Sequence, residues 1–90
     1  MDSYKIRWSD YALNNLSKTH PTDTMRIVKK VNLLKNNPNL GTKLRGGFKK
    51  YRRIRVGKYR VIYRKKEDVL TILVLNVGKR ENIYKKGISG

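Results

Sequence analysis

Arginine is concentrated in one short stretch of the chain, residues 51–64, which reads YRRIRVGKYRVIYR. The Gly57-Lys58 pair in this stretch suits a two-residue type II′ turn, which needs a positive φ at its first central position. Two antiparallel strands joined by this turn place Arg55 directly opposite Arg60. Because a guanidinium group is planar and can donate two parallel hydrogen bonds to a phosphate, the pattern predicts a phosphate-binding surface.

The two strands are expected to have one basic and one apolar face, because successive side chains of a strand alternate. The basic face carries Tyr51, Arg53, Arg55, Arg60, Ile62 and Arg64, and the apolar face carries Ile54, Val56, Tyr59, Val61 and Tyr63, with Arg52 as the exception. Like charges opposite each other destabilise a sheet, and a bound phosphate would offset this repulsion. The alternative interpretation is a solvated strand face on a very basic protein.

The catalytic groups most common in nucleases are scarce. His20 is the only histidine and precedes Pro21, so a structural or exposed role is expected for it, and a catalytic pair of histidines is excluded. The six carboxylates are scattered without the spacing of a metal site, so neither a metal nor a cofactor is expected. A nuclease built from this chain would be metal-independent and would work by charge stabilisation and substrate positioning.

Composition narrows the range of partners and compartments. The 90 residues include 23 Lys and Arg against six Asp and Glu, a formal net charge of +17, which favours nucleic acid as a partner. A basic ribosomal or chromatin-type protein fits the charge equally well. The absence of cysteine excludes disulfides and suits the cytoplasm, and no signal peptide or membrane span is expected.

Hydrophobic periodicity predicts an α+β fold with the order β-α-α-β-β-β. An antiparallel sheet with a helical hairpin packed on one face is expected, in a single domain over residues 1–90. Ser9 is the expected N-cap of the first helix, and Pro21 lies in the first turn of the second. The expected strands are 4–8, 51–56, 59–64 and 69–77, and Gly78 ends the last of them. The expected helices run from Ser9 to about Lys18 and from Pro21 to Asn36-Asn37-Pro38, and a loop covers residues 40–50.

Three short motifs, in this order, resemble the RelE family of ribosome-dependent messenger-RNA endonucleases, part of the RelE/ParE toxin superfamily. The motifs are Leu44-Arg45-Gly46, the block Gly57-Lys58-Tyr59-Arg60-Val61-Ile62-Tyr63, and Val77-Gly78-Lys79-Arg80-Glu81 followed by Tyr84. Each motif is weak alone, but the order, the chain length and the charge agree as well. The resemblance implies a RelE-like fold and the toxin half of a type II toxin–antitoxin system.

The resemblance also implies a set of site residues. The catalytic residues would be Arg53, Arg55, Arg60, Arg80 and Tyr84, with Arg45, Lys58, Arg64, Lys79 and Glu81 as RNA-binding or supporting residues. Arg60 and Arg80, both expected to face solvent, would clamp the scissile phosphate, and Arg53 or Arg55 would assist the 2′-oxygen or the leaving 5′-oxygen. Tyr84 would stack on a base, orient the 2′-hydroxyl or transfer a proton.

The implied activity is cleavage of messenger RNA in the ribosomal A site by attack of the 2′-hydroxyl on the adjacent phosphate, which inhibits translation. The implied partners are the ribosome, messenger RNA and an acidic RelB-like antitoxin. The alternative is a ParE-type inhibitor of DNA gyrase, which has the same fold and no nuclease activity. A plain basic RNA-binding protein would fit the charge but gives no reason for the three motifs.

Overall fold

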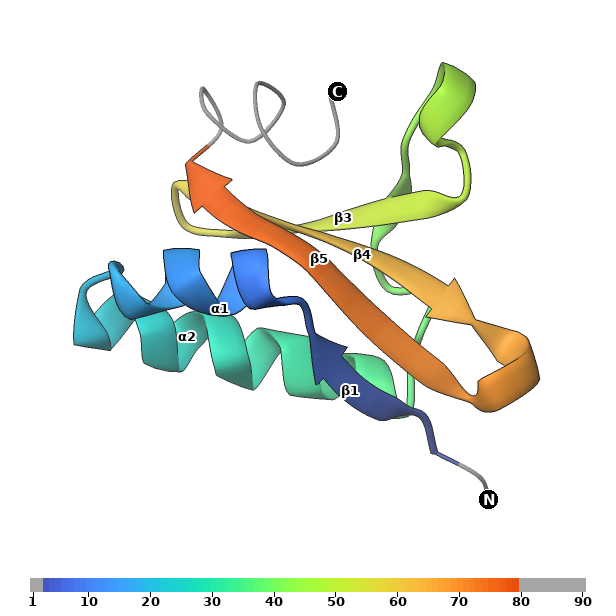
Figure 1. Ribbon diagram of the computed structural model, residues 1–90, viewed down its shortest axis with the longest axis horizontal. Coiled ribbons are helices and arrows are strands. Elements are labelled where there is room, and N and C mark those ends of the chain that lie inside the picture. Colours follow the sequence, from blue (N-terminus) through green and yellow to red (C-terminus); the bar gives the residue numbers. More distant parts are fainter. Residues whose placement is uncertain (1–2, 80–90) are drawn as a thin grey trace.

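The computed structural model describes residues 3–79, in which two α-helices lie along one face of a five-stranded sheet (Figure 1). The strands are β1 (Lys5–Trp8), β2 (Thr42–Lys43), β3 (Tyr51–Val56), β4 (Tyr59–Lys66) and β5 (Thr71–Lys79). The helices are α1 (Asp10–Ser17) and α2 (Pro21–Asn32), and the short 3₁₀ turns are η1 (Leu33–Lys35), η2 (Gly46–Phe48) and η3 (Glu67–Val69). The α+β class and the predicted order of the longer elements are confirmed. Neither helix in residues 3–79 is long and apolar enough to cross a membrane.

The sheet is mixed, so one pair of strands departs from the antiparallel pairing that was predicted. The strand order is β1-β5-β4-β3-β2, and β1 runs parallel to β5, with Lys5 opposite Thr71 and Trp8 opposite Val74. The other three pairs are antiparallel. Local sequence patterns specify hairpins between consecutive strands, whereas the first strand docks through tertiary packing after a long connection, as parallel pairing requires.

The predicted hairpin between β3 and β4 is confirmed in its register. Arg55 lies opposite Arg60, and Val56 lies opposite Tyr59. Gly57 has a φ of 60°, and Lys58 has no positive φ, as the type II′ turn requires. The register predicted from alternation and turn type therefore holds along the whole hairpin.

The last strand differs from its predicted bounds. Val69 and Leu70 belong to the η3 turn and its end, where Leu70 has the left-handed φ of 46°. Gly78, predicted to end the strand, lies inside β5 opposite Arg60. Glycine weakens a strand through its conformational entropy, but the ladder to β4 holds it extended here.

Both helices begin with a side-chain cap. The Oγ of Ser9 accepts a hydrogen bond from the Ala12 N–H at 3.0 Å, as the sequence predicts. The Nδ1 of His20 accepts one from the Thr22 N–H at 3.2 Å, directly before Pro21 at the start of α2. The only histidine is therefore an exposed helix cap, in agreement with the structural role expected for it.

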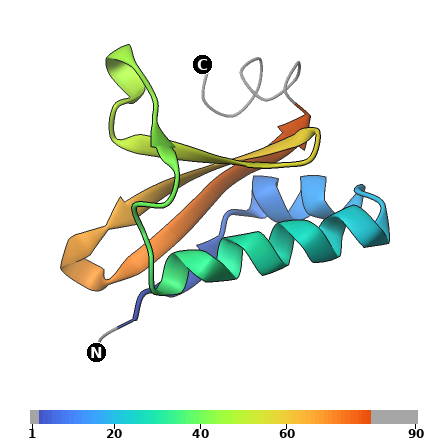
Figure 2. The same ribbon diagram turned by 180° about the vertical axis from the view of Figure 1, so that it is seen from behind.

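The core lies between the helices and the apolar face of the sheet (Figure 2). Its buried residues are Ala12, Ile27, Val31, Leu34, Ile54, Val61, Tyr63, Ile72, Val74 and Val77. Arg52, the exception on the apolar face of the hairpin, donates from Nη1 to the Gly41 carbonyl at 2.7 Å. This hydrogen bond holds the loop before β2 against β3.

Tyr63 fixes the same loop from inside the core. Its hydroxyl donates to the Pro38 carbonyl at 2.8 Å and accepts from the Gly41 N–H at 2.9 Å. Burial raises the pKa of Tyr63 above its ordinary value of 10.0, so the hydroxyl keeps its proton in the folded protein. A Cβ on Gly41 would lie 2.6 Å from the Arg53 carbonyl oxygen and 2.8 Å from the Tyr63 ring, so only glycine fits there.

Replacement of Tyr63 by Phe should lower the free energy of unfolding by about 1–3 kcal/mol, because it leaves the Gly41 N–H and the Pro38 carbonyl without their partner. Urea unfolding followed by circular dichroism measures this change. Tyr59→Phe is the matched control. It also removes one phenolic hydroxyl and keeps the ring, but Tyr59 is only partly buried beside the core. Equal stability of the Tyr63→Phe and Tyr59→Phe proteins would contradict this account of the loop.

Candidate active site

Three arginines lie together on the face of the β3–β4 hairpin that points away from the core. Arg55 is exposed and stands opposite Arg60, and Arg53 lies two residues along the same strand. Side chains directly opposite in such a pair have Cβ atoms about 4.5–5.5 Å apart, so the two guanidinium groups can reach one phosphate. The predicted grouping of Arg53, Arg55 and Arg60 on one face is confirmed.

Arg60 is more enclosed than expected. Only 8% of Arg60 is exposed, so the prediction of a solvent-facing side chain was wrong. The reason is its place on β4, which has β3 on one side and β5 on the other. Ile62, on the same face, is fully buried. This enclosure argues against the interpretation of the face as a freely solvated basic strand.

Gly78 of β5 lies beside Arg60 and adds no side chain to this face. The two residues are opposite each other in the ladder between β4 and β5. A Cβ placed on Gly78 would meet no described atom within 4 Å. Among the described residues, Gly78 therefore leaves Arg60 without a neighbouring side chain on the β5 side of this face.

The described carboxylates lie elsewhere. Asp10 and Asp23 lie in the first turns of the helices, where they complement the helix dipole. Glu67 and Asp68 lie in η3, and Glu67 pairs with Lys65 at 3.5 Å. In residues 3–79 no three His, Cys, Asp or Glu side chains gather into a group that could hold a metal ion. The strands that carry the arginines therefore contribute positive charge without a carboxylate of their own.

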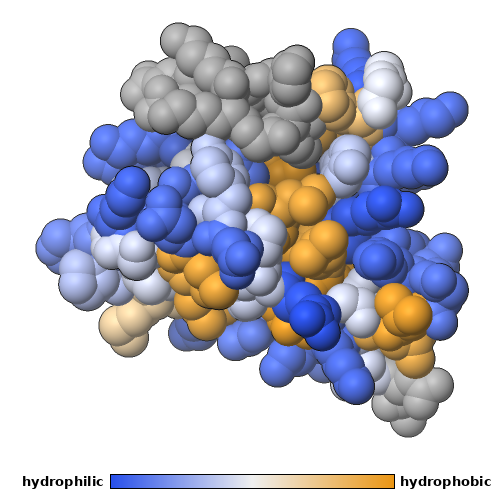
Figure 3. Space-filling view, in the orientation of Figure 1, coloured by the Kyte–Doolittle hydropathy of each residue, from blue (hydrophilic) through white to orange (hydrophobic). Residues whose placement is uncertain are grey.

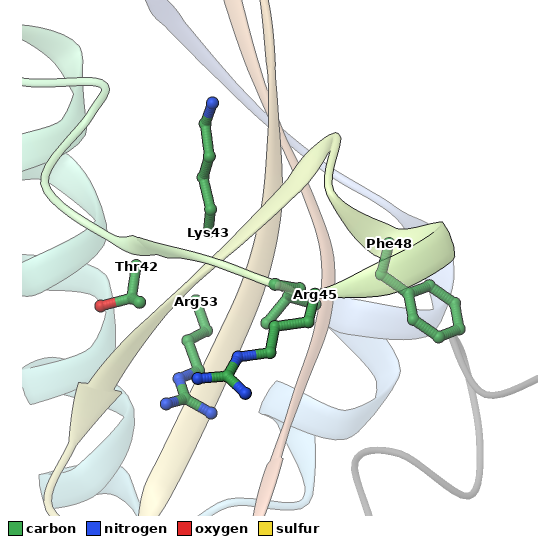
Figure 4. A pocket seen from close by; sticks show the side chains of 6 residues that line it. Thr42, Lys43, Arg45, Phe48 and Arg53 are labelled. Atoms are coloured by element: carbon green, nitrogen blue, oxygen red, sulfur yellow. The ribbon is translucent and has the colours of Figure 1, made fainter.

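Arg45 joins this face through the loop between β2 and β3. It lines a pocket of about 430 Å³ together with Arg53 and with Thr42, Lys43, Leu44 and Phe48. Figure 4 shows the guanidinium groups of Arg45 and Arg53 directed toward the same side of this pocket. The loop with η2 stands on the side of the sheet opposite the helices in both ribbon views (Figures 1 and 2). The structure thus brings Arg45, chosen through the resemblance, next to the arginine face.

The remaining predicted residues are spread more widely. Lys58 lies at the exposed tip of the hairpin, and Arg64 continues the arginine face, half-buried, further along β4. Lys79 pairs with Tyr59 and lines a pocket with residues of α1, so it lies toward the helices and away from the arginine face. Arg80, Glu81 and Tyr84 lie outside the described residues, and their assignments stay predictions.

Sequence reasoning missed the other side chains of this pocket, Phe48 above all. The loop over residues 40–50 was expected to have no regular structure, but it contains β2 and η2. Phe48 is the only phenylalanine of the chain and stands among glycines and lysines, which was the available signal. Charge alone would not have located the site, because hydrophilic side chains cover much of the surface seen in Figure 3, with apolar ones mainly in a central band.

Comparison with known protein families gives a match over most of the chain. Residues 6–84 match the family described as the ParE toxin of type II toxin–antitoxin systems. The chain belongs to the RelE/ParE superfamily of toxins. No curated protein matched the sequence of this toxin.

Solved structures of RelE toxins have the same fold. The toxin is similar to a chain of the RelBE2 toxin–antitoxin complex of Mycobacterium tuberculosis, with 28% identity, a TM-score of 0.80, and 87% of this chain and 99% of that chain covered. An arginine-to-alanine double mutant of the Escherichia coli RelE toxin in the free state gives 24% identity and a TM-score of 0.82, with 97% and 96% covered. The archaeal RelE–RelB complex of Pyrococcus horikoshii gives 23% identity and a TM-score of 0.72, with 86% of this chain and 94% of that chain covered.

Proposed function

We propose that this toxin is a ribosome-dependent, metal-independent endoribonuclease that cuts messenger RNA in the A site and thereby inhibits translation. The observation that carries the proposal is the group of Arg53, Arg55 and Arg60 on one face of the hairpin, with Arg45 beside it. Four guanidinium groups on one side of a sheet provide bidentate donors for consecutive phosphates of an RNA strand.

In the proposed reaction the 2′-oxygen of one nucleotide attacks the adjacent phosphorus, and the bond to the 5′-oxygen breaks. The products are a 2′,3′-cyclic phosphate and a free 5′-hydroxyl, with one proton leaving the 2′-oxygen and one reaching the 5′-oxygen. Arg60, with only a glycine opposite it on β5, would hold the phosphate and stabilise the growing negative charge. Arginine stays protonated in proteins, so it serves as a charge and a donor and does not act as the general base.

The other roles follow from the resemblance to RelE toxins. Arg80 would share the phosphate with Arg60, and Tyr84 would bind a base, orient the 2′-hydroxyl or transfer a proton. Arg53 or Arg55 would assist the attacking or the leaving oxygen. Lys58, Arg64, Lys79 and Glu81 would support RNA binding, and residues 1–90 would act as one toxin domain.

An acidic RelB-like antitoxin is the proposed protein partner. The similar structures from Mycobacterium tuberculosis and Pyrococcus horikoshii are complexes of such toxins with antitoxins. A net charge of +17 favours an acidic partner, since complementary charge steers association and offsets the toxin's self-repulsion. We place the toxin in the cytoplasm, where its ribosomal target is found.

Inhibition of DNA gyrase is the second candidate function. The matching family is described by the name ParE, and the ParE-type toxins considered above act on gyrase without cutting RNA. Such an activity requires a protein-binding surface and gives no direct reason for Arg45 and three strand arginines on one side of the sheet. The endoribonuclease is therefore the better supported of the two.

Purified toxin added to translating ribosomes should cut messenger RNA inside the A-site codon. Primer extension locates the cut, and the new 3′ end should be a 2′,3′-cyclic phosphate or a 3′-phosphate, because no water takes part in the first step. A parallel assay measures supercoiling and DNA breaks by gyrase with the same preparation. Intact messenger RNA together with gyrase-dependent DNA breaks would replace this proposal by the ParE-type function.

A further inference from the structure

Phe48 has a position that the core does not explain. It lies in η2, 37% exposed, and is not among the residues of the hydrophobic core cluster. Its neighbours in the pocket are Arg45, Arg53 and Lys43, together with Thr42 and Leu44 (Figure 4). The pocket thus combines an aromatic ring with two guanidinium groups, and this combination points to a ligand with both an aromatic and an anionic part.

The turn that carries the ring is held by backbone contacts. The Phe48 N–H donates to the Arg45 carbonyl at 3.3 Å, and the Lys49 N–H donates to the Gly46 carbonyl at 3.3 Å. Gly46 has a φ of 64°, which an L-residue with a side chain rarely adopts. The Leu44 N–H donates to the Tyr51 carbonyl at 3.0 Å and closes the loop at its base. Arg45 and Phe48 are therefore presented together on one turn.

We propose that this pocket binds one unpaired nucleotide of the RNA substrate, with the base stacked on the Phe48 ring and a phosphate on Arg45 and Arg53. The inference rests on the proposed function, since it takes RNA as the substrate. Proteins that bind single strands combine a positively charged groove with aromatic side chains on which bases stack. Because Arg53 lines this pocket and also belongs to the arginine face, the nucleotide lies next to the phosphate that is cut.

The proposal also predicts which nucleotides the contact with Phe48 can distinguish. Phenylalanine has a π-face but no hydrogen-bonding group, and every base can stack on it. The stacking contact therefore selects an unpaired nucleotide over a paired one and discriminates little among the four bases. Sequence preference, where it exists, comes from other contacts.

Binding of a single-stranded RNA that carries one 2-aminopurine tests the stacking contact. A 2′-O-methyl group at each position blocks the attacking 2′-oxygen and prevents cleavage, and stacking quenches the 2-aminopurine fluorescence. Phe48→Ala and Phe48→Leu should weaken binding about five- to 140-fold, the equivalent of 1–3 kcal/mol for one stacked base, and should lose the quenching. Phe48→Tyr keeps the π-face and should behave as the wild type. Met25→Ala, at a 74% exposed residue of α2, is the control for the loss of an exposed apolar side chain.

The salt dependence of RNA binding distinguishes the contribution of the guanidinium group from that of the aromatic ring. Arg45→Ala should reduce the slope of log affinity against log salt by about 1, whereas Phe48→Ala should leave that slope unchanged. Arg26→Ala on α2 controls for the loss of one exposed charge. A change of slope in Phe48→Ala equal to that in Arg45→Ala would overturn the division of roles between ring and guanidinium.

The outcomes also separate this proposal from the proposed function. Wild-type affinity and quenching in Phe48→Ala, with A-site cutting intact, would overturn the nucleotide pocket alone. Absence of cutting by the wild-type toxin on ribosomes would overturn the proposed function, whatever the binding assay shows. Normal RNA binding with weakened antitoxin binding in Phe48→Ala would assign the pocket to a protein partner and overturn the proposal.

Discussion

Toxin carrying Arg60→Ala should cut messenger RNA on ribosomes about 100- to 1,000-fold more slowly than the wild type, which is the usual effect of removing one donor from a developing anion. Expression of this variant should no longer arrest growth. The fold should survive, because removal of Arg60 also relieves the like-charge contact with Arg55 across the hairpin. Circular dichroism and thermal unfolding verify the fold, and single-turnover cleavage measures the rate.

Two further variants sharpen this test. Arg60→Lys keeps the positive charge but lacks the planar pair of donors, so it should recover only part of the rate. Arg26→Ala removes an exposed arginine from α2, far from the arginine face in the chain's architecture, and should cut as fast as the wild type. Full toxicity of a folded Arg60→Ala protein would remove Arg60 from the proposed site.

RNA bound in the ribosomal A site should be cut far faster than the same RNA free in solution. In-line attack requires the 2′-oxygen, the phosphorus and the 5′-oxygen to be aligned, and good positioning contributes about 7–11 kcal/mol to such a reaction. The described part of the toxin offers an arginine face and an open pocket, but no histidine beside them. We expect the ribosome to supply the alignment and the toxin to supply the charge.

Binding and cutting should therefore separate on free RNA. The +17 charge drives association with any RNA, and this association should weaken steeply as salt rises. Single-turnover rates on one RNA, free and ribosome-bound, measure the contribution of the ribosome, while fluorescence anisotropy measures binding. Equal rates on both substrates would mean that the toxin aligns its substrate without help.

What could be predicted from the sequence was mostly local. The register that brings Arg55 opposite Arg60 follows from alternation and from the turn type of Gly57-Lys58, both of which are properties of a few consecutive residues. The Ser9 cap of α1 and the start of α2 at Pro21 follow in the same way, whereas His20 was expected only to be structural or exposed, and its capping role was not predicted. Local rules suffice here because the strands of the hairpin adjoin each other in sequence and in space.

The errors concern contacts between residues far apart in the chain. The burial of Arg60 depends on β5 packing beside β4, and the position of Gly78 within β5 depends on the same pairing. The local pattern of a strand does not identify which distant strand it pairs with. The approach of Arg45 and Phe48 to Arg53 depends on how the loop over residues 40–50 folds back over β3. Arg45 was found only because a motif carried it.

The parallel pairing of β1 with β5 has a consequence for the order of folding. The Ser9 N–H donates to the Val74 carbonyl and the Ser9 Oγ to the Leu75 carbonyl, each at 2.9 Å and more than 60 residues away along the chain. Contacts of such high sequence separation slow folding, because the entropy of closing the loop is lost before the contact forms. A nascent chain has no partner for β1, and no β5 neighbour for Arg60, until residues 71–79 have been synthesised. We expect the toxin to gain its active form only after residues 71–79 have emerged from the ribosome that makes them.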